Sequence, residues 1–139
     1  MTETTALLTA EGFAAAAGVS RETRERLEAY AACLVTWQER MNLVGRSTLE
    51  DIWRRHMQDS AQLLRHIPAG CRRLVDLGSG AGFPGLVLSI LGVQGVELVE
   101  SDQKKAAFLR AAALASGSDA VIHACRAEDL PVGHADVVT

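Results

Sequence analysis

The segment at residues 75–85 reads VDLGSGAGFPG and places four glycines within eight residues, directly after an acidic side chain. The apolar run RLVDL at 73–77 has the composition of a buried strand. Glycine has no Cβ and reaches positive φ easily, so this turn can bring bare backbone close to a large polar ligand. Ligands of open parallel sheets bind beyond the carboxyl ends of the strands. The pattern therefore predicts a ligand site here, with a tight turn that binds nothing as the alternative.

Two classes of ligand fit these glycines. Gly80, Gly82 and Gly85 satisfy G-x-G-x-x-G, the dinucleotide pattern, and Glu100 follows about 20 residues on, where an acid would bind ribose hydroxyls. Asp76, two residues before the first glycine, would repel a pyrophosphate but suits the cationic amino-acid group of S-adenosylmethionine. The residues thus favour S-adenosylmethionine over a nicotinamide dinucleotide. Glu100 would bind the ribose in either case, or else it is a solvated strand end.

The chain before residue 67 has a helical pattern. Apolar side chains recur there at three- and four-residue steps, which places them on one face of a helix. They are Leu27, Tyr30, Ala31, Leu34, Trp37 and Met41. Ser20 is the predicted N-cap of this helix. A second helix is predicted to begin at STLE, residues 47–50, which has the spacing of a capping box, and to run to Pro68.

Strands and helices alternate after Gly70. Strands are predicted at 73–77, 96–100, 120–123 and 135–139, and helices at 84–91 and 104–115. This alternation implies a parallel sheet with helical crossovers, an α/β Rossmann-like fold. We expect a helical extension at 1–70 that packs as one globular unit with the first part of a Rossmann-like domain at 71–139. The fourth strand would be an exposed sheet edge, so we expect the domain to be C-terminally incomplete.

Composition limits the classes of function. The 139 residues carry a formal charge of -3, so a nucleic-acid contact would need a local basic patch. Residues 40–73 supply one, with seven arginines against three acidic residues; a solvated helix face is the alternative. Cys33, Cys71 and Cys125 lack paired spacing, which fits reduced thiols in the cytoplasm better than a zinc site or a disulfide framework.

Several motifs together resemble one family. VDLGSGAGFPGLVLSI at 75–90, LVESDQKKAAFLR at 98–110 and CRAEDLP at 125–131 resemble the RsmG (GidB) family of bacterial 16S rRNA guanine-N7 methyltransferases, as do WQERMNLVG at 37–45 and RRHMQDS at 54–60. The resemblance implies a class I S-adenosylmethionine-dependent methyltransferase fold with an N-terminal helical extension. It also implies methyl transfer to N7 of one guanosine in 16S rRNA. Members of the family continue beyond the fourth strand, so we expect this chain to be truncated.

The resemblance also implies site residues. For the cofactor, Asp76, Gly78, Gly80 and Gly82 would hold the methionine part, Glu100 the ribose, and Ala127 and Glu128 the adenine, with Phe83 and Ser101 completing the set. The candidates for RNA binding are Arg46, Arg54, Arg55, Lys104 and Arg126. No metal is implied.

Methyl transfer to guanine N7 needs few catalytic groups. The methyl group of S-adenosylmethionine is already activated and N7 carries a free lone pair at neutral pH, so no general base is required. Catalysis would consist mostly of positioning, with water excluded. Arg55, His56 and Asp59 are the positioning candidates, on a helix expected to close over the cofactor cleft. Arg55 and Asp59 are also i,i+4 neighbours, so a surface ion pair is the alternative.

Two other functions stay open on the sequence. One is an NAD(P)-dependent oxidoreductase, which rests on the overlapping glycine pattern. The other is a non-catalytic fragment that binds a cofactor or RNA. For the leading interpretation we expect a cytoplasmic monomer that acts on 16S rRNA or the small ribosomal subunit, away from membranes, with association through the sheet edge as a further possibility.

Overall fold

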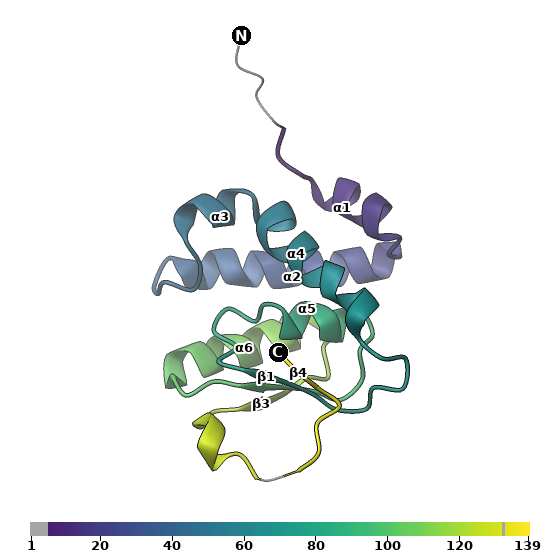
Figure 1. Ribbon diagram of the computed structural model, residues 1–139. Helices are drawn as coiled ribbons and strands as arrows, with labels where there is room; N and C mark the ends of the chain where they lie inside the picture. Colours follow the sequence, from purple (N-terminus) through teal and green to yellow (C-terminus); the bar gives the residue numbers. More distant parts are fainter. Residues whose placement is uncertain (1–5, 132) are drawn as a thin grey trace.

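The computed structural model describes residues 6–131 and 133–139, and its elements form three layers (Figure 1). The first layer consists of helices α1 (Ala10–Ala17), α2 (Arg21–Gln38), α3 (Arg46–Glu50) and α4 (Asp59–Gln62). The second layer consists of α5 (Gly85–Ile90) and α6 (Gln103–Ser116), which lie between the first layer and a sheet. Within the described residues, no helix is long and apolar enough to span a membrane.

The sheet is fully parallel. Its strands are β1 (Leu74–Leu77), β2 (Val96–Val99), β3 (Val121–His123) and β4 (Val137–Val138), in the order β3-β2-β1-β4. The predicted α/β fold and its four strands are confirmed, and β4 is an edge strand as expected. The segment between β3 and β4 contains the short helix η3 (Ala127–Asp129) and runs along the side of the sheet away from α5 and α6 (Figure 1).

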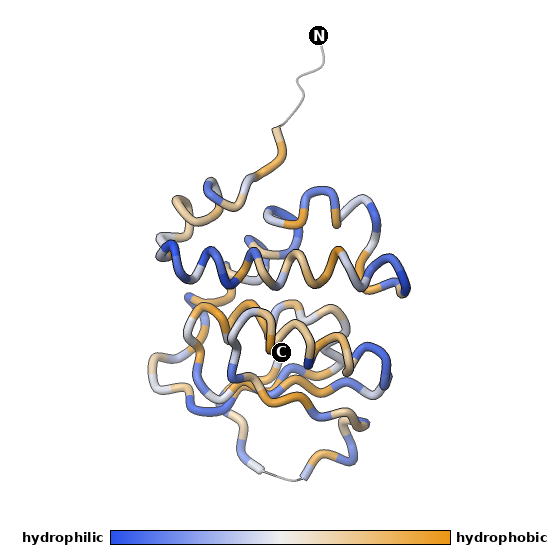
Figure 2. The backbone as a smooth tube through the Cα atoms, turned by 180° about the vertical axis from the view of Figure 1, so that it is seen from behind, coloured by the Kyte–Doolittle hydropathy of each residue, from blue (hydrophilic) through white to orange (hydrophobic). Residues whose placement is uncertain are grey.

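Helix α2 follows the sequence prediction closely. Ser20 is its N-cap, and the Ser20 hydroxyl accepts a hydrogen bond from the Thr23 amide at 3.1 Å. Of the predicted apolar face, Leu27, Tyr30 and Leu34 are fully buried against α5 and α6. Ala31 and Trp37 are half-buried, and Met41 lies beyond the end of the helix, which is at Gln38. Along α2 hydrophobic residues alternate with strongly hydrophilic ones, whereas the strands and α5 are mostly hydrophobic (Figure 2). The amphipathic pattern thus fixes which side of α2 meets the rest of the fold.

The predicted capping box at residues 47–50 is wrong. Helix α3 begins at Arg46 after Gly45, so Ser47 lies inside the helix, and the Thr48 hydroxyl donates to the Gly45 carbonyl at 2.7 Å instead. The helix also ends early, because Asp51 leaves the helical region with φ −120° and ψ 47°.

The chain from residue 53 to 66 is helical but not one regular helix. It continues as a π-helical segment, η1 (Trp53–Gln58), then α4, then a 3₁₀ turn, η2 (Leu63–His66). This broken path buries Ile52 and Met57, at 8% and 0% exposure.

One hydrophobic cluster joins all three layers. It contains Phe13 of α1 and Leu34 of α2 together with Leu86 of α5, Phe108 of α6 and Leu98 of β2. The helical layer is therefore part of the same core as the sheet.

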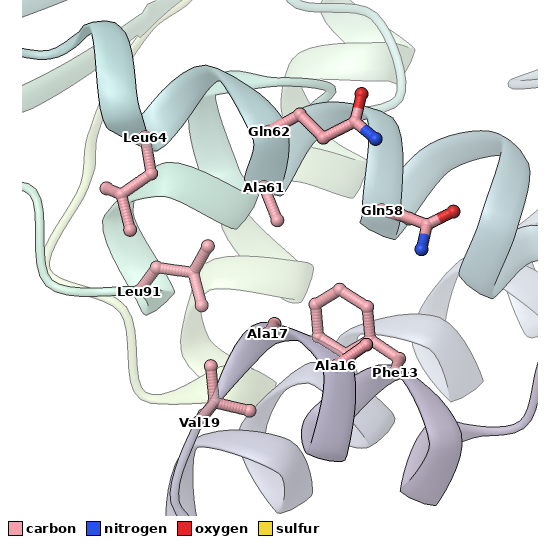
Figure 3. Close-up of a pocket in the computed structure, with 9 residues that line it drawn as sticks. All are labelled: Phe13, Ala16, Ala17, Val19, Gln58, Ala61, Gln62, Leu64 and Leu91. Atoms are coloured by element: carbon pink, nitrogen blue, oxygen red, sulfur yellow. The ribbon is translucent and has the colours of Figure 1, made fainter.

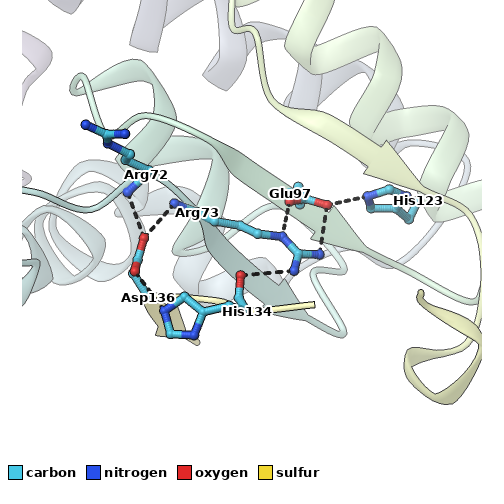
Figure 4. A network of polar contacts seen from close by, with 6 residues as sticks. All are labelled: Arg72, Arg73, Glu97, His123, His134 and Asp136. Atoms are coloured by element: carbon cyan, nitrogen blue, oxygen red, sulfur yellow. Dashed lines mark hydrogen bonds and ion pairs between the residues drawn. The ribbon is translucent and has the colours of Figure 1, made fainter. Parts of the chain in front are cut away.

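The sheet also carries a polar network that joins its strands (Figure 4). Glu97 of β2 forms an ion pair with Arg73 at 2.6 Å and a hydrogen bond with His123 at 2.7 Å. Asp136, just before β4, accepts hydrogen bonds from the amides of Arg72 and Arg73 at 2.9 and 3.1 Å. The hydrogen bond from Arg73 lowers the pKa of Glu97. Arg73, part of the predicted basic stretch, is thus engaged in holding the sheet.

A small cavity of about 280 Å³ lies between α1 and α4 (Figure 3). Its walls are mostly apolar and include Phe13, Val19, Leu64 and Leu91, with the amides of Gln58 and Gln62 beside them. Leu91 follows the carboxyl end of α5, so this cavity is at the end of α5 opposite to the glycine turn.

Candidate functional site

The glycine turn leaves β1 at the edge where the parallel strands end. The amides of Gly78 and Ser79 donate hydrogen bonds to the Val99 carbonyl at the end of β2, at 2.9 and 3.1 Å. The Ser79 hydroxyl donates to the Asp76 carbonyl at 3.0 Å. These bonds fix the turn across the carboxyl ends of β1 and β2, the usual ligand position in an open parallel sheet.

Close packing explains the later glycines of the turn. A Cβ on Gly82 would lie 2.6 Å from the Tyr30 hydroxyl, and φ at Gly82 is 95°, which favours glycine. A Cβ on Gly85 would lie 2.5 Å from the side chain of Leu98. Gly82 therefore lets α2 approach the turn, and Gly85 lets the start of α5 approach the sheet. By contrast, a Cβ on Gly78 would meet nothing within 4 Å, so its backbone faces open space.

Asp76 lies beneath the turn. Its side chain is buried, and its two carboxylate oxygens accept hydrogen bonds from the Thr139 hydroxyl at 3.0 Å and from the Gly85 amide at 3.3 Å. Burial raises the pKa of the Asp76 carboxyl, and the hydrogen bonds from Thr139, Ser79 and Gly85 oppose that rise. The predicted acid is thus at the turn, and its carboxylate is buried rather than exposed in a cleft.

Glu100 connects the turn to the start of α6. Its carboxylate accepts from the Gly80 amide at 2.8 Å with one oxygen and from the Asp102 amide at 2.9 Å with the other. Asp102 in turn caps α6 by accepting from the amides of Lys104 and Lys105 at 2.9 and 3.0 Å. Each Glu100 oxygen keeps further acceptor capacity, as a carboxylate has about four lone-pair sites.

A cavity of about 330 Å³ borders the first glycine. It is lined by Gly78, Ser101, Arg126, Ala127 and Glu128, together with Val99 and Cys125. These come from the ends of β1, β2 and β3. The structure therefore brings together four predicted cofactor residues that are up to 50 positions apart in the sequence: Gly78, Ser101, Ala127 and Glu128.

Three stacked rings connect the helical layer to the turn. The ring of Tyr30 in α2 stacks on Phe83 at a centroid distance of 5.3 Å, and Phe83 stacks on His56 at 4.6 Å. The Tyr30 hydroxyl is fully buried and donates a hydrogen bond to the Ala81 carbonyl. Sequence reasoning placed Tyr30 on the apolar face but missed this contact. The available signal was a polar tip on a buried face, which needs a hydrogen-bond partner.

The same residues match a known family. The family model described as rRNA small subunit methyltransferase G, or GidB, matches residues 23–139. This match includes the glycine turn, all four strands and most of helix α2. The chain belongs to the GidB family.

Relatives with the same description are close in sequence. The ribosomal RNA small subunit methyltransferase G of Rhodospirillum rubrum is 61% identical over 132 residues, which are 95% of this chain and 66% of the relative. The corresponding protein of Rhodospirillum centenum is 59% identical over 130 residues, 94% of this chain and 60% of the relative. The chain thus spans less than two thirds of the length of these relatives. Membership of a methyltransferase family implies that the reaction uses a methyl donor.

The three positioning candidates predicted for a GidB protein lie together. Arg55, His56 and Asp59 line a cavity of about 220 Å³ with Phe83 and Pro84 of the glycine turn. Within the described residues Arg55 and Asp59 form no ion pair; the pair in this region is Arg54 with Asp51, at 3.2 Å. Burial lowers the pKa of His56, and the nearby Asp59 carboxylate opposes this. The helical segment therefore does meet the turn at this cavity.

The RNA-binding candidates come from different elements of the fold. Arg54 is engaged by Asp51, and Arg46 is exposed at the start of α3. Arg55 and Arg126 line the two cavities beside the turn. Lys104 is exposed at the start of α6.

Proposed function

We propose that the protein transfers a methyl group from S-adenosylmethionine to N7 of a guanosine in 16S rRNA, in the cytoplasm. Family membership supports the reaction class. The observation that carries the proposal is the arrangement at the carboxyl ends of the strands, where a cavity borders Gly78 and the Glu100 carboxylate bonds to the Gly80 amide.

The residues at this edge fit the parts of S-adenosylmethionine. The cavity lined by Ser101, Ala127 and Glu128 would take the adenine, and the spare acceptor capacity of Glu100 suits the ribose hydroxyls. The amino-acid part carries an ammonium group beside the sulfonium. The buried charge of Asp76 beneath the turn would attract both cations without direct contact. Gly78, Gly80, Gly82 and Phe83 supply the backbone between these groups.

Methyl transfer to guanine N7 needs side chains that position the base, and no general base. When bound, S-adenosylmethionine supplies a methyl group already activated by the sulfonium. The lone pair of guanine N7 forms the new bond to carbon, the sulfur keeps the electron pair of the bond that breaks, and the positive charge passes to the base. The chain must therefore align the guanine and keep water out. The cavity of Arg55, His56 and Asp59 against Phe83 is suited to this, since a carboxylate there would stabilise the developing charge on the base.

A calorimetric titration of this chain with S-adenosylmethionine, S-adenosylhomocysteine and NAD tests the cofactor. We expect the two adenosyl compounds to bind and NAD not to bind. Asp76→Asn keeps the shape of the side chain and removes its charge. It should weaken binding of S-adenosylmethionine more than that of S-adenosylhomocysteine, whose sulfur is uncharged. Asp119→Asn, at an exposed acid after α6, is the matched control. Binding of NAD alone would overturn the proposal.

Methylation of RNA tests the substrate. Naked 16S rRNA and small ribosomal subunits are incubated with the chain and S-adenosylmethionine labelled in the methyl group. N7-methylguanosine is then located by reduction and aniline cleavage, which breaks the RNA at that base. Label recovered on another atom or another base would overturn the proposed acceptor.

A further inference from the structure

A groove lies beside the glycine turn, between the end of α2 and the start of α6. We call it the α2–α6 groove; it is lined by Trp37, Glu39, Arg40, Met41, Lys104 and Ala107, and it has a volume of about 530 Å³. Neither the cavity at Gly78 nor the one at His56 includes any of these residues. A volume of this size is ordinary for a site that binds a drug-sized ligand.

The walls of the groove combine an aromatic ring with cations. Trp37 is half-buried, and its ring is fixed edge-on against Phe108 of α6 at a centroid distance of 5.8 Å. Arg40 and Lys104 are exposed, and within the described residues neither forms an ion pair. Fixed aromatic rings that stack on bases, with cations that meet phosphates, are how proteins bind unpaired nucleotides.

The groove is connected to the glycine turn by a short hydrogen-bonded path. Gly80 donates to Glu100, Glu100 accepts from Asp102, and Asp102 accepts from the amide of Lys104. Lys104 follows Glu100 by four residues, so their Cα atoms are at most about 14 Å apart. Lys104, at the edge of the groove, therefore lies near Glu100, which bonds to the glycine turn.

We propose that the α2–α6 groove binds an unpaired nucleotide of the RNA close to the one that is methylated. The base lies against Trp37 and Met41, and the phosphates on either side contact Arg40 and Lys104. Glu39 lines the same groove and repels phosphate, so it accepts from the amino group of the base instead. This inference rests on the proposed function, because it gives the same RNA a second contact.

The test measures RNA binding by this chain. The probe is a single-stranded RNA of 16S sequence with 2-aminopurine at successive positions, whose fluorescence falls when the base stacks on an indole. Trp37→Leu keeps an apolar side chain against Phe108 and should weaken binding about 5- to 150-fold, which is the loss of one base–aromatic stack. Trp53→Leu, which removes the tryptophan that packs on Phe13, is the matched control and should leave RNA affinity unchanged.

The charged residues give a readout that does not depend on core packing. Arg40→Gln and Lys104→Gln should each make the slope of log affinity against log salt shallower by about 0.7, as expected when a single strand loses one phosphate contact. Arg65→Gln, at an exposed arginine in η2, should not change it.

The outcomes separate this inference from the proposed function. Equal effects of Trp37→Leu and Trp53→Leu on RNA affinity, or unchanged salt slopes, would refute RNA binding in the groove. Neither result would change the outcome of the titration with S-adenosylmethionine. The same holds if the chain binds S-adenosylmethionine but no RNA, or if the groove variants weaken binding of a ribosomal protein instead. Failure of S-adenosylmethionine to bind would count against the proposed function alone.

Discussion

The hydrogen bond from Tyr30 to Ala81 makes a sharp prediction about stability. Tyr30→Phe removes one buried hydroxyl and leaves the ring of this α2 residue stacked on Phe83. The Ala81 carbonyl is then left without this partner, in a position where the surrounding residues are buried. The cost of leaving a buried acceptor unsatisfied is about 1–3 kcal/mol. With a urea m-value of about 2 kcal/mol/M, the unfolding midpoint should fall by about 0.5–1.5 M.

Urea unfolding followed by circular dichroism measures this change. Thr36→Val is the control, because it removes a hydroxyl that donates to a carbonyl four residues earlier on the exposed side of the same helix. We expect its effect to stay within about 0.5 kcal/mol. We also expect Tyr30→Phe to weaken S-adenosylmethionine binding, since the turn loses a contact that holds its backbone.

A double-mutant cycle with Gly82→Ala tests the geometry itself. In the native background the new Cβ would lie 2.6 Å from the Tyr30 oxygen. In the Tyr30→Phe background that oxygen is absent, and the nearest atoms are side-chain atoms of Leu86 and Leu109 at 3.2 and 3.3 Å. Gly82→Ala should therefore cost at least about 1 kcal/mol less in the Tyr30→Phe background than in the native one. Additive effects of the two substitutions would refute the placement of the hydroxyl against Gly82.

Three further outcomes follow from the site and the sheet. Burial raises the pKa of Asp76, so stability is lost as pH rises from the unfolded pKa through the higher folded pKa of this carboxyl. Asp76→Asn should remove that loss when urea unfolding is measured at a series of pH values. The pKa of Glu97 is instead lowered, chiefly by Arg73, so it stabilises the fold above the unfolded pKa. Glu97→Gln should be less stable at neutral pH, by a margin that shrinks as the solution is acidified. Gly85→Ala, whose Cβ would lie 2.5 Å from Leu98, should cost about 1–3 kcal/mol in thermal or urea unfolding.

Local signals in the sequence were sufficient for much of the fold. The strand before the glycine turn, the N-cap at Ser20 and the helix at 104–115 depend on residues close to each other in the sequence, and all three are found in the structure. The capping box at Ser47 is absent because α3 already begins at Arg46, after Gly45. The break at Asp51, which is followed by the buried Ile52, is likewise not visible in the four residues of the motif.

The site was predictable in its residue types and less so in its contacts. The glycines and the acids were evident from spacing. The partners of these groups come from distant segments: Tyr30 bonds a carbonyl 51 residues away, and Thr139 bonds Asp76 from 63 residues away. No local pattern predicts such pairs, because they form only when α2 is packed on α5 and α6 and β4 is paired with β1. For the same reason, the sequence did not predict that the Asp76 side chain is buried and accepts hydrogen bonds from Thr139 and Gly85.

Helix α2 contacts both the glycine turn and the α2–α6 groove. Tyr30 holds the turn where the methyl donor would bind, and Trp37, two helical turns further on, lines the groove proposed for RNA. Binding at the two sites would be coupled if both ligands favoured the same position of this helix. By reciprocity, each ligand would then change the dissociation constant of the other by the same factor. We expect RNA to bind more tightly to the chain saturated with S-adenosylmethionine, and equal RNA affinity with and without it would show that α2 does not couple the two sites.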